Sequence, residues 1–225
     1  MKKYQSIKGF YDVLPDKQKY WRFFYETAYQ VLDRYAYEEI KLPIVENTDL
    51  YIHSVGEQTD IVEKEMYSWQ DNLNNDKLTL RPEGTAGCVR AVIENNLTYN
   101  GPIRLFYKGP MFRHENVQKG RQRQFNQLGI EAFGFSEPIL DAEIICLLDS
   151  LWKNLGLKNI ELQINNIGDP EERAVYRQEL IKYFETHQDE LDEDAKRRLY
   201  TNPMRILDSK NPKMQGLIDK APKFL

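Results

Sequence analysis

The amino-acid sequence predicts an α+β fold in which helices flank a mixed, mainly antiparallel sheet. Two long segments repeat apolar residues with helical spacing, at residues 16–37 and 136–155. Two strand-like segments, residues 103–115 and 124–134, enclose a polar loop as in a hairpin. Hydrophobic residues make up 41% and charged residues 29% of the 225 residues, which is typical of a globular protein that buries a core.

The remaining elements of the first half follow from shorter patterns. Residues 38–51 alternate apolar and polar side chains around Pro43. Because proline removes a backbone donor, this segment is predicted to be an edge strand or a strand that meets another surface. Two short strands and a helix are predicted further along, at residues 65–69, 78–84 and 85–95.

The second half contains one more strand and one more helix. Gly156 marks the left-handed end of the second long helix, and residues 160–168 alternate apolar side chains as a strand does. Asp169 and Pro170 predict the start of a helix. Charged residues dominate after this helix, so the sequence predicts two parts, residues 1–186 and 187–225.

Composition excludes several classes of protein. The net charge of −4 argues against a surface that is basic throughout, so any nucleic-acid contact is expected in a local patch. Cys88 and Cys146 lie too far apart in sequence to suggest a zinc site or a disulfide framework, and we assign no metal ligand. No apolar run has the length of a membrane span and the N-terminus has no signal peptide pattern, so a cytoplasmic protein without membrane contact is expected.

One face of the second hairpin strand is polar. Alternation places Phe125, Gln127, Gly129 and Glu131 together, opposite the apolar residues that enter the core. A polar strand face is most often simply exposed to solvent. Here the mixed charges and the glycine, which would let a ligand approach the backbone, favour a small-molecule site.

Two neighbouring segments are predicted to extend this polar face. Arg113 and Glu115 share one side of the first hairpin strand, and Arg81, Glu83 and Thr85 have the same parity in the segment RPEGT. Carboxylates and amides suit ammonium and ring N–H groups, whereas arginines suit phosphates.

The loop of residues 116–123 is the densest basic cluster in the sequence. Such a cluster attracts polyanions, although an ordinary charged hairpin tip fits the same pattern.

The hairpin resembles a known family. Residues 106–134 are similar to the second signature motif of class II aminoacyl-tRNA synthetases, in which Phe-Arg-x-Glu ends one strand and Arg-x-x-x-Phe opens the next. Residues 38–46 resemble the first motif, whose proline lies at the dimer interface. RPEGT, together with Gln127, Gly129 and Glu131, narrows the resemblance to histidyl-tRNA synthetases, and KGFYDVLP near the N-terminus also fits.

The resemblance implies an ATP site and an Mg²⁺ cofactor. Arg113 would bind the α-phosphate and act in catalysis, Glu115 would lie on the adenosine side, Arg121 would reach the outer phosphates and Phe125 would stack on adenine. Positioning and charge neutralisation suffice for the attack of a carboxylate on a phosphorus atom.

The resemblance also implies sites for histidine and tRNA. Glu83, Thr85 and Gln127 would hold the α-amino group, and Glu131 would accept the imidazole N–H. The tRNA acceptor end would contact the basic loop through Gln118, Lys119 and Arg123.

The function that the resemblance implies is that of a histidine–tRNA ligase, acting as a homodimer. The third motif of the family would lie beyond Leu225, so we expect this chain to be an incomplete N-terminal catalytic portion with weak or no activity alone, and residues 187–225 to lead into an insertion domain. A catalytically inactive, histidine-sensing regulatory paralogue is the alternative. A module that only binds tRNA or dimerises is a third possibility.

Overall fold

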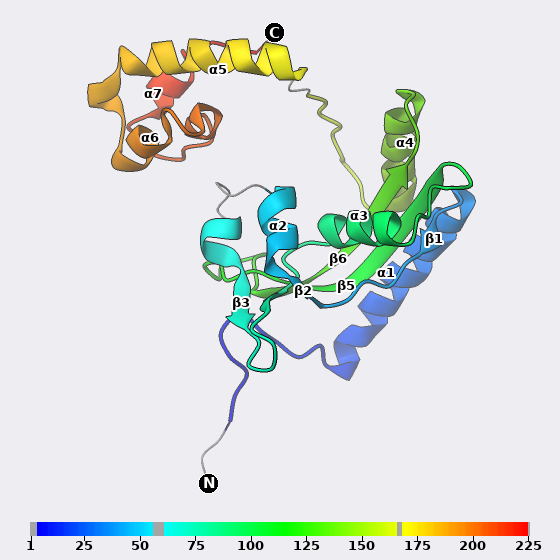
Figure 1. The fold of residues 1–225 in the computed structure, drawn as a ribbon. Coiled ribbons are helices and arrows are strands. Elements are labelled where there is room, and N and C mark those ends of the chain that lie inside the picture. The colour runs from blue at the N-terminus through cyan, green and yellow to red at the C-terminus, as the bar shows by residue number, and fades with distance from the viewer. Residues whose placement is uncertain (1–3, 56–60, 166–167, 225) are drawn as a thin grey trace. The chain divides into compact units, whose positions relative to one another are not determined.

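The computed structural model describes residues 4–55, 61–165 and 168–224. The chain forms two units, Met1–Ile160 and Glu161–Leu225 (Figure 1). Each unit has its own buried core.

The first unit is built on a three-stranded central sheet with the order β1-β5-β6. Its strands are β1 (Glu38–Glu39), β5 (Ile103–Phe112) and β6 (Gln124–Phe133). The long strands β5 and β6 are antiparallel, and Ile103 lies opposite Phe133. The short β1 runs parallel to β5 at one edge. The predicted hairpin and the mixed character of the sheet are thereby confirmed.

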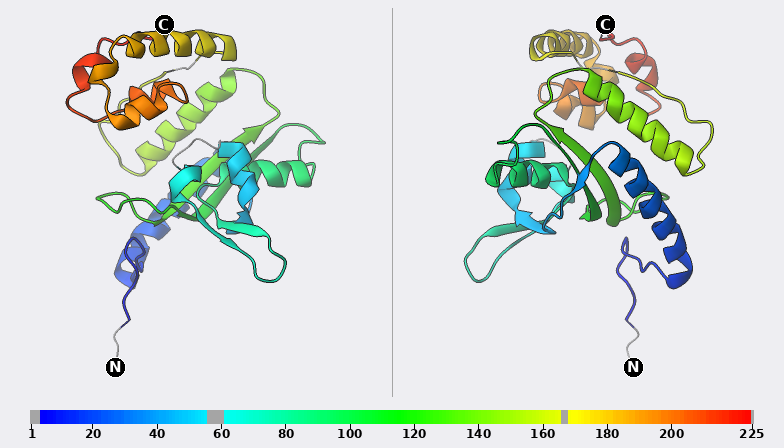
Figure 2. Two further views of the ribbon diagram at one scale, coloured as in Figure 1. Left: turned by 60° about the vertical axis from the view of Figure 1, so that its left-hand side comes forward. Right: turned by 90° about the vertical axis from the view of Figure 1, so that its right-hand side faces the viewer.

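One face of the central sheet is covered by α1 (Pro15–Arg34) and α4 (Ile139–Asn154), as Figure 2 shows from the side. These helices bury a hydrophobic cluster against the sheet. Its buried members are Ala28, Val31, Leu32, Tyr37, Phe106, Leu147 and Leu151. Both helices were predicted from their apolar spacing, and Gly156 has the expected positive φ of 78° after α4.

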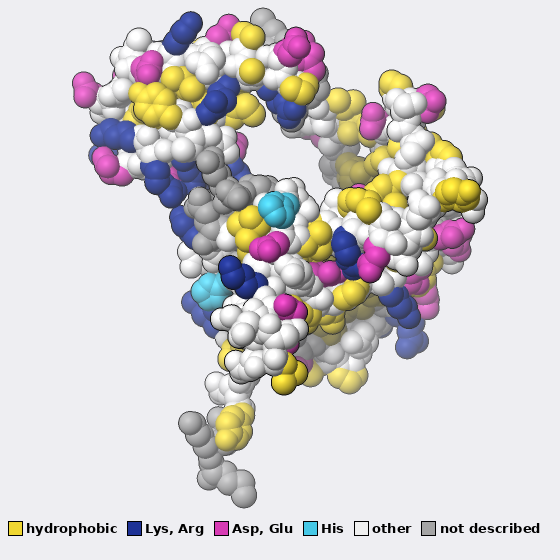
Figure 3. All heavy atoms as spheres, viewed as in Figure 1, with side chains coloured by type: hydrophobic (Ala, Val, Ile, Leu, Met, Phe, Trp, Pro, Cys, Tyr) yellow, Lys and Arg dark blue, Asp and Glu magenta, His cyan; other side chains and the backbone are white. Residues whose placement is uncertain are grey.

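The other face of the central sheet is covered in part by α3 (Thr85–Glu94). The inner side of this helix packs against β5, in a cluster that includes Cys88, Val92, Leu105, Tyr107 and Met111. Its outer side leaves Val89 and Ile93 exposed, and hydrophobic side chains are visible at the surface over α3 in Figure 3.

A second, small sheet has the order β2-β4-β3. Its strands are β2 (Val45–Asn47), β4 (Lys77–Leu80) and β3 (Tyr67–Gln70), and α2 (Thr48–Val55) and the π-helix η1 (Ile61–Glu65) lie between β2 and β3 in sequence. Thr79 is fully buried at the centre of this sheet, where its hydroxyl lies 2.8 Å from that of Thr48 and 2.5 Å from that of Ser68.

The prediction of a single edge strand around Pro43 is only partly right. The strand is interrupted, because β1 and β2 lie on either side of Pro43 and join different sheets. Buried Arg81 connects the sheets at this point: its guanidinium donates to the carbonyl oxygens of Leu42 and Pro43, at 2.9 and 3.3 Å, and to that of Pro110 at 2.9 Å.

The second unit is helical. It contains α5 (Pro170–Glu185), the 3₁₀ turns η2 (Gln188–Glu190) and η3 (Pro203–Ile206), and the short helices α6 (Glu193–Arg198) and α7 (Gln215–Ile218). As predicted, Asp169 caps α5. Its carboxylate accepts from the backbone N–H groups of Glu171 and Glu172, and the Glu172 carboxylate accepts in return from the Asp169 N–H.

The boundary between the units differs from the predicted boundary near residue 186. Leu180 and Phe184 of α5 are fully buried in one cluster with Leu191, Leu199 and Met214. Because these contacts bind α5 to the charged segment that follows it, the chain divides between Ile160 and Glu161.

The strand predicted at residues 160–168 is not formed in the described part, residues 160–165. Residues 166 and 167 lie outside the described residues. Leu162 and Ile164 are exposed, and a strand requires a hydrogen-bonded neighbour, which the described strands do not provide. None of the helices in the described ranges is long and apolar enough to cross a membrane.

Candidate active site

The α3-facing side of β6 carries the residues that the alternation predicted. Phe125, Gln127 and Glu131 lie on this face and are half-buried, opposite Met111, Gly109 and Leu105 of β5. The other face of β6 contributes Leu128 and Ile130 to the hydrophobic cluster under α1 and α4. The polar face of β6 is therefore partly enclosed.

The segment RPEGT lies beside this face, but it is not a strand as predicted. The prediction that Arg81, Glu83 and Thr85 share a strand face is wrong, because β4 ends at Leu80. Glu83 instead lies at the start of α3, where its carboxylate accepts from the backbone N–H groups of Thr85 (2.5 Å) and Ala86 (2.9 Å). These bonds satisfy donors that a helix N-terminus otherwise leaves unpaired.

Arg81 has a structural role. Its side chain is engaged by the three carbonyl groups described above, and Gly109 leaves the space that its guanidinium occupies. Burial lowers the pKa of Arg81. This role could not be predicted from the sequence, because it depends on carbonyl groups that are distant in the chain.

Gly129 is needed for a reason other than ligand access. A Cβ atom at Gly129 would overlap the ring of Tyr107, and so would a Cβ atom at Gly84. The Tyr107 ring fills the space that the sequence analysis had given to a ligand. Its hydroxyl donates to Glu131 at 3.3 Å and lies 3.4 Å from the Thr85 hydroxyl.

Glu83 and Glu131 are the two carboxylates near the Tyr107 hydroxyl and the start of α3. Among the residues that the structure describes, neither Glu83 nor Glu131 forms an ion pair. Burial raises the pKa of the Cys88 thiol to about 12, and the negative charges of Glu131 and Glu83 raise this pKa further. A negative potential of this kind favours a ligand that brings N–H donors and positive charge.

Arg113 lies toward the loop end of the same face. Its guanidinium stacks over the Phe125 ring, 5.2 Å from the centroid, and its Nε donates to the Pro82 carbonyl at 2.9 Å. Arg113 forms no ion pair with any carboxylate in the described ranges, so its charge is free to meet an anion.

The loop after β5 places the other basic residues. Glu115 is largely buried, with a 15% exposed side chain, and pairs with the exposed Arg121 at 3.2 Å. Gln118 and Arg121 exchange backbone hydrogen bonds around a tight turn, which leaves Lys119 exposed. Arg123 is half-buried and its Nε donates to the Glu115 carbonyl at 3.2 Å, so it also supports the loop from within.

The N-terminal segment holds this loop in place. The Gly9 carbonyl accepts from the backbone N–H groups of Arg123 (2.9 Å) and Gln124 (3.1 Å). A Cβ atom at Gly9 would lie 2.6 Å from the Arg123 side chain, and Gly9 has a φ of 88°. Glycine is therefore required here both by its backbone conformation and by space.

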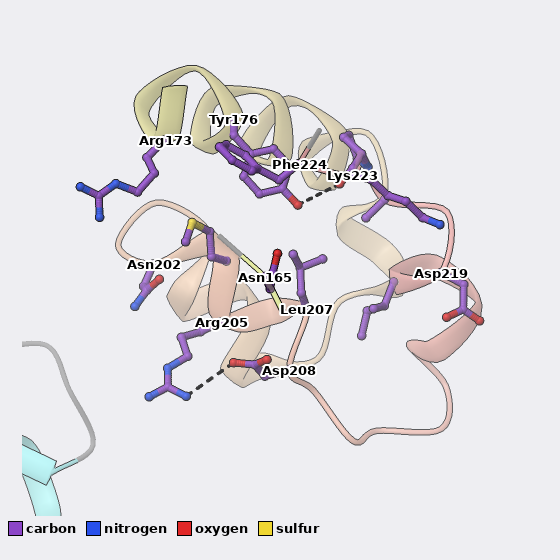
Figure 4. A pocket seen from close by; sticks show the side chains of 14 residues that line it. Asn165, Arg173, Tyr176, Asn202, Arg205, Leu207, Asp208, Asp219, Lys223 and Phe224 are labelled. Atoms are coloured by element: carbon purple, nitrogen blue, oxygen red, sulfur yellow. Dashed lines mark hydrogen bonds and ion pairs between the residues drawn. The ribbon is translucent and has the colours of Figure 1, made fainter. Parts of the chain in front are cut away.

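The second unit contains a separate cavity of about 690 Å³ (Figure 4). Its wall carries both signs of charge, from Arg173, Arg205, Lys223, Asp208 and Asp219. Arg205 and Asp208 pair with each other at 3.5 Å. No residue of the predicted site lines this cavity.

The central sheet with its hairpin, loop and flanking helices is the fold of class II aminoacyl-tRNA synthetases. The fold resembles that of apo histidyl-tRNA synthetase from S. aureus, with 35% identity and a TM-score of 0.71 over 98% of this chain and 51% of that one. An ATP phosphoribosyltransferase regulatory subunit/histidyl-tRNA synthetase from Bacillus halodurans has the same fold, with a TM-score of 0.64 and 23% identity over 92% of this chain and 57% of that one.

Residues 9–170 match the family described as histidyl-tRNA synthetase, and the chain belongs to this family. The histidine–tRNA ligase of Methylobacillus flagellatus is 66% identical over 99% of this chain and 54% of its own length. That of Laribacter hongkongensis is 56% identical over 99% of this chain and 53% of its own length. The chain thus spans about half the length of the curated relatives it matches.

Proposed function

We propose that this chain carries the histidine-binding and ATP-binding part of a histidine–tRNA ligase. The observation that carries this proposal is the distribution of unpaired charge along one face of β6. Among the residues that the structure describes, Glu83 and Glu131 form no ion pair with a cation, and Arg113, toward the loop end of this face, forms none with a carboxylate. A ligand with N–H groups at one end and an anionic group at the other matches this distribution.

Histidine fits the carboxylate end. Glu131 would accept the imidazole N–H, and Glu83, Thr85 and Gln127 would surround the ammonium group. Because these groups are partly buried, an amino acid without a ring N–H would leave the Glu131 carboxylate unpaired, at a cost of about 1–3 kcal/mol. This cost is the physical basis of selection for histidine.

ATP fits the Arg113 end. Phe125 would stack on adenine beside Glu115, Arg113 would contact the α-phosphate, and Arg121 would leave Glu115 to reach the outer phosphates. Mg²⁺ would accompany ATP and neutralise part of the phosphate charge.

The reaction that follows from this arrangement is adenylation. A histidine carboxylate oxygen forms a bond to the α-phosphorus, and the bond from that phosphorus to the pyrophosphate oxygen breaks. Arg113 stabilises the negative charge that develops on the α-phosphate. In the second step the tRNA 3′ hydroxyl takes the histidyl group and AMP leaves.

We propose that the loop at residues 116–123 meets the tRNA acceptor end. The support is the exposure of Gln118, Lys119 and Arg121 at the turn. Since the Arg123 side chain also supports the loop, its replacement would change loop structure as well as tRNA contact.

We also propose that the protein acts as a cytoplasmic homodimer, with the surface around Pro43 at the interface. Ile44 and Val45 are 44% and 40% exposed beside Pro43. Exposed apolar side chains grouped in this way are typical of contact surfaces. Replacing Val45 with Lys should shift a dimer to monomer in analytical ultracentrifugation. An unchanged sedimentation coefficient would place the interface elsewhere.

A histidine-sensing regulatory paralogue remains the second candidate, and it shares the fold. The free Arg113 stacked on Phe125 favours the ligase, because a sensor of histidine alone needs no phosphate-binding arginine. Binding of ATP to this chain, lost in Arg113→Gln, supports the ligase. Histidine binding without ATP binding supports the sensor.

The experiment that tests the histidine site is calorimetric titration of histidine into the chain and into Glu131→Gln. The substitution removes the charge and keeps the shape, so the affinity should fall about tenfold to a hundredfold. Glu94→Gln is the control, since this carboxylate lies on the exposed side of α3. Equal affinities of Glu131→Gln and the unsubstituted chain would contradict the proposed site.

A further inference from the structure

Tyr107 connects the two ends of the proposed histidine site. It is 4% exposed, and its ring lies in a slot between Gly84 at the start of α3 and Gly129 of β6. Its hydroxyl lies between the Glu131 carboxylate and the Thr85 hydroxyl, at 3.3 and 3.4 Å. Both distances exceed the usual value of about 2.8 Å for a hydrogen bond between two oxygen atoms.

The chemistry of the three groups fixes the direction of both hydrogen bonds. An ionised carboxylate can only accept, so the single Tyr107 proton is donated to Glu131. The Tyr107 oxygen can then only accept from Thr85, whose own proton is used in that bond. Burial also raises the pKa of Tyr107, so the phenol keeps its proton in the neutral pH range.

The Thr85 oxygen at one end of the site and the Glu131 carboxylate at the other therefore both present lone pairs to a ligand. Thr85 is exposed, and if its proton is donated to Tyr107, its oxygen can only accept from a ligand. Tyr107 contacts only Oε1 of the Glu131 carboxylate, so the other oxygen can meet the ligand.

We propose that Tyr107 is a positioning residue that fixes Thr85 and Glu131 as hydrogen-bond acceptors and thereby selects a ligand with two separated N–H donors. The inference deepens the proposed function and rests on it. Tyr107 acts through Thr85 and Glu131, and its hydroxyl sets their orientation. Without that hydroxyl, the Thr85 proton can turn toward the ligand and oppose an ammonium group.

Tyr107→Phe tests this proposal, because it removes one oxygen atom and keeps the ring between its two glycines. Histidine and 3-(2-thienyl)alanine, which has a ring of similar size without an N–H group, are titrated into each variant by calorimetry. We expect the preference for histidine over the thienyl analogue to fall about tenfold in Tyr107→Phe. Tyr37→Phe is the matched control, since its hydroxyl is buried on the opposite face of the sheet.

Three other results would overturn the inference. If Tyr107→Phe keeps the full preference, the hydroxyl does not position the site. If both ligands weaken by the same factor, Tyr107 does not act through Glu131 on the ring N–H, and the proposed selection of two N–H donors is wrong. If the unsubstituted chain binds neither ligand, the proposed histidine site itself is wrong and the inference fails with it.

A double-mutant cycle tests whether Thr85, Tyr107 and Glu131 act together as one relay of hydrogen bonds. Thr85→Val removes the Thr85 proton and keeps the side-chain shape. If the two hydroxyls act in one relay, the effects of Thr85→Val and Tyr107→Phe on histidine affinity will be less than additive. Additive effects would contradict the relay.

Discussion

Two buried tyrosines on opposite faces of the central sheet show how differently these faces are built. Tyr37 is 3% exposed in the cluster under α1 and α4, and its hydroxyl has no hydrogen-bond partner among the described residues. Tyr107 is 4% exposed under α3, and its hydroxyl contacts both Thr85 and Glu131.

The comparison separates a face that stabilises the fold from a face that carries chemistry. Under α1 and α4, a hydrophobic cluster surrounds the Tyr37 hydroxyl, which has no hydrogen-bond partner in the described ranges. Under α3, Gly84 and Gly129 make room for the Tyr107 ring, and Glu83 and Glu131 form no ion pair with any cation in the described ranges. Changes on the first face should therefore alter stability alone, and changes on the second should alter binding as well.

The largest effect on stability is expected for Leu147→Ala on the α1 and α4 face. Leu147 is 1% exposed, and its truncation should lower the free energy of unfolding by about 3 kcal/mol. Urea denaturation measures this loss. The preference for histidine over 3-(2-thienyl)alanine should not change below the unfolding transition. A changed preference would show that the two faces are not independent.

A smaller loss of stability, combined with a loss of binding, is expected for Gly129→Ala on the α3 face. The new methyl group overlaps the Tyr107 ring, so stability should fall by about 2 kcal/mol and histidine affinity at least tenfold. Gly216→Ala in α7 is the control, because nothing lies within 4 Å of the added Cβ atom there. Normal histidine binding by Gly129→Ala would mean that the Tyr107 slot does not shape the site.

Alkaline pH should lower the stability of the fold through buried tyrosines on both faces of the sheet. Burial is the largest cause that raises the pKa of both Tyr37 and Tyr107. Above pH of about 10 the unfolded chain releases these protons and the folded chain keeps them, so stability falls by up to about 1.4 kcal/mol per pH unit for each tyrosine. Below that pH this contribution is fully present. Urea denaturation between pH 9 and 11 should show a shallower decline in Tyr37→Phe and in Tyr107→Phe. A decline that neither substitution changes would contradict the burial of both hydroxyls.

The smallest effect is expected for Tyr37→Phe at neutral pH. Removing an unsatisfied buried hydroxyl should raise the free energy of unfolding by about 1 kcal/mol, with histidine binding unchanged. Thermal unfolding monitored by circular dichroism measures this gain. A loss of stability would show that the Tyr37 hydroxyl has a partner in solution, such as a buried water molecule.

The elements with local signals could be predicted from the sequence. Helical spacing identified α1 and α4, Asp169 and Pro170 identified the start of α5, and the alternation in β6 separated Gln127 and Glu131 from the core residues. These signals depend on residues close together in the chain.

The features that depend on distant neighbours could not be predicted. The end of β4 at Leu80, the carbonyl partners of Arg81 and the slot around Tyr107 all require the register between β5 and β6 or the packing of α3. Gly129 was predicted to leave space on the polar face of β6. That the Tyr107 ring fills this space could not be predicted, because Tyr107 belongs to the neighbouring strand β5. The exposed segment before α5 shows the same limit, since alternation alone does not supply a neighbouring strand.

The most direct test of the account is a crystal structure of this chain with histidine bound. We predict that the imidazole N–H lies within about 3 Å of the Glu131 carboxylate and the ammonium nitrogen within about 3 Å of the Thr85 oxygen. Histidine bound away from the α3-facing side of β6, or in the opposite orientation, would contradict the assignment of that face as the histidine site.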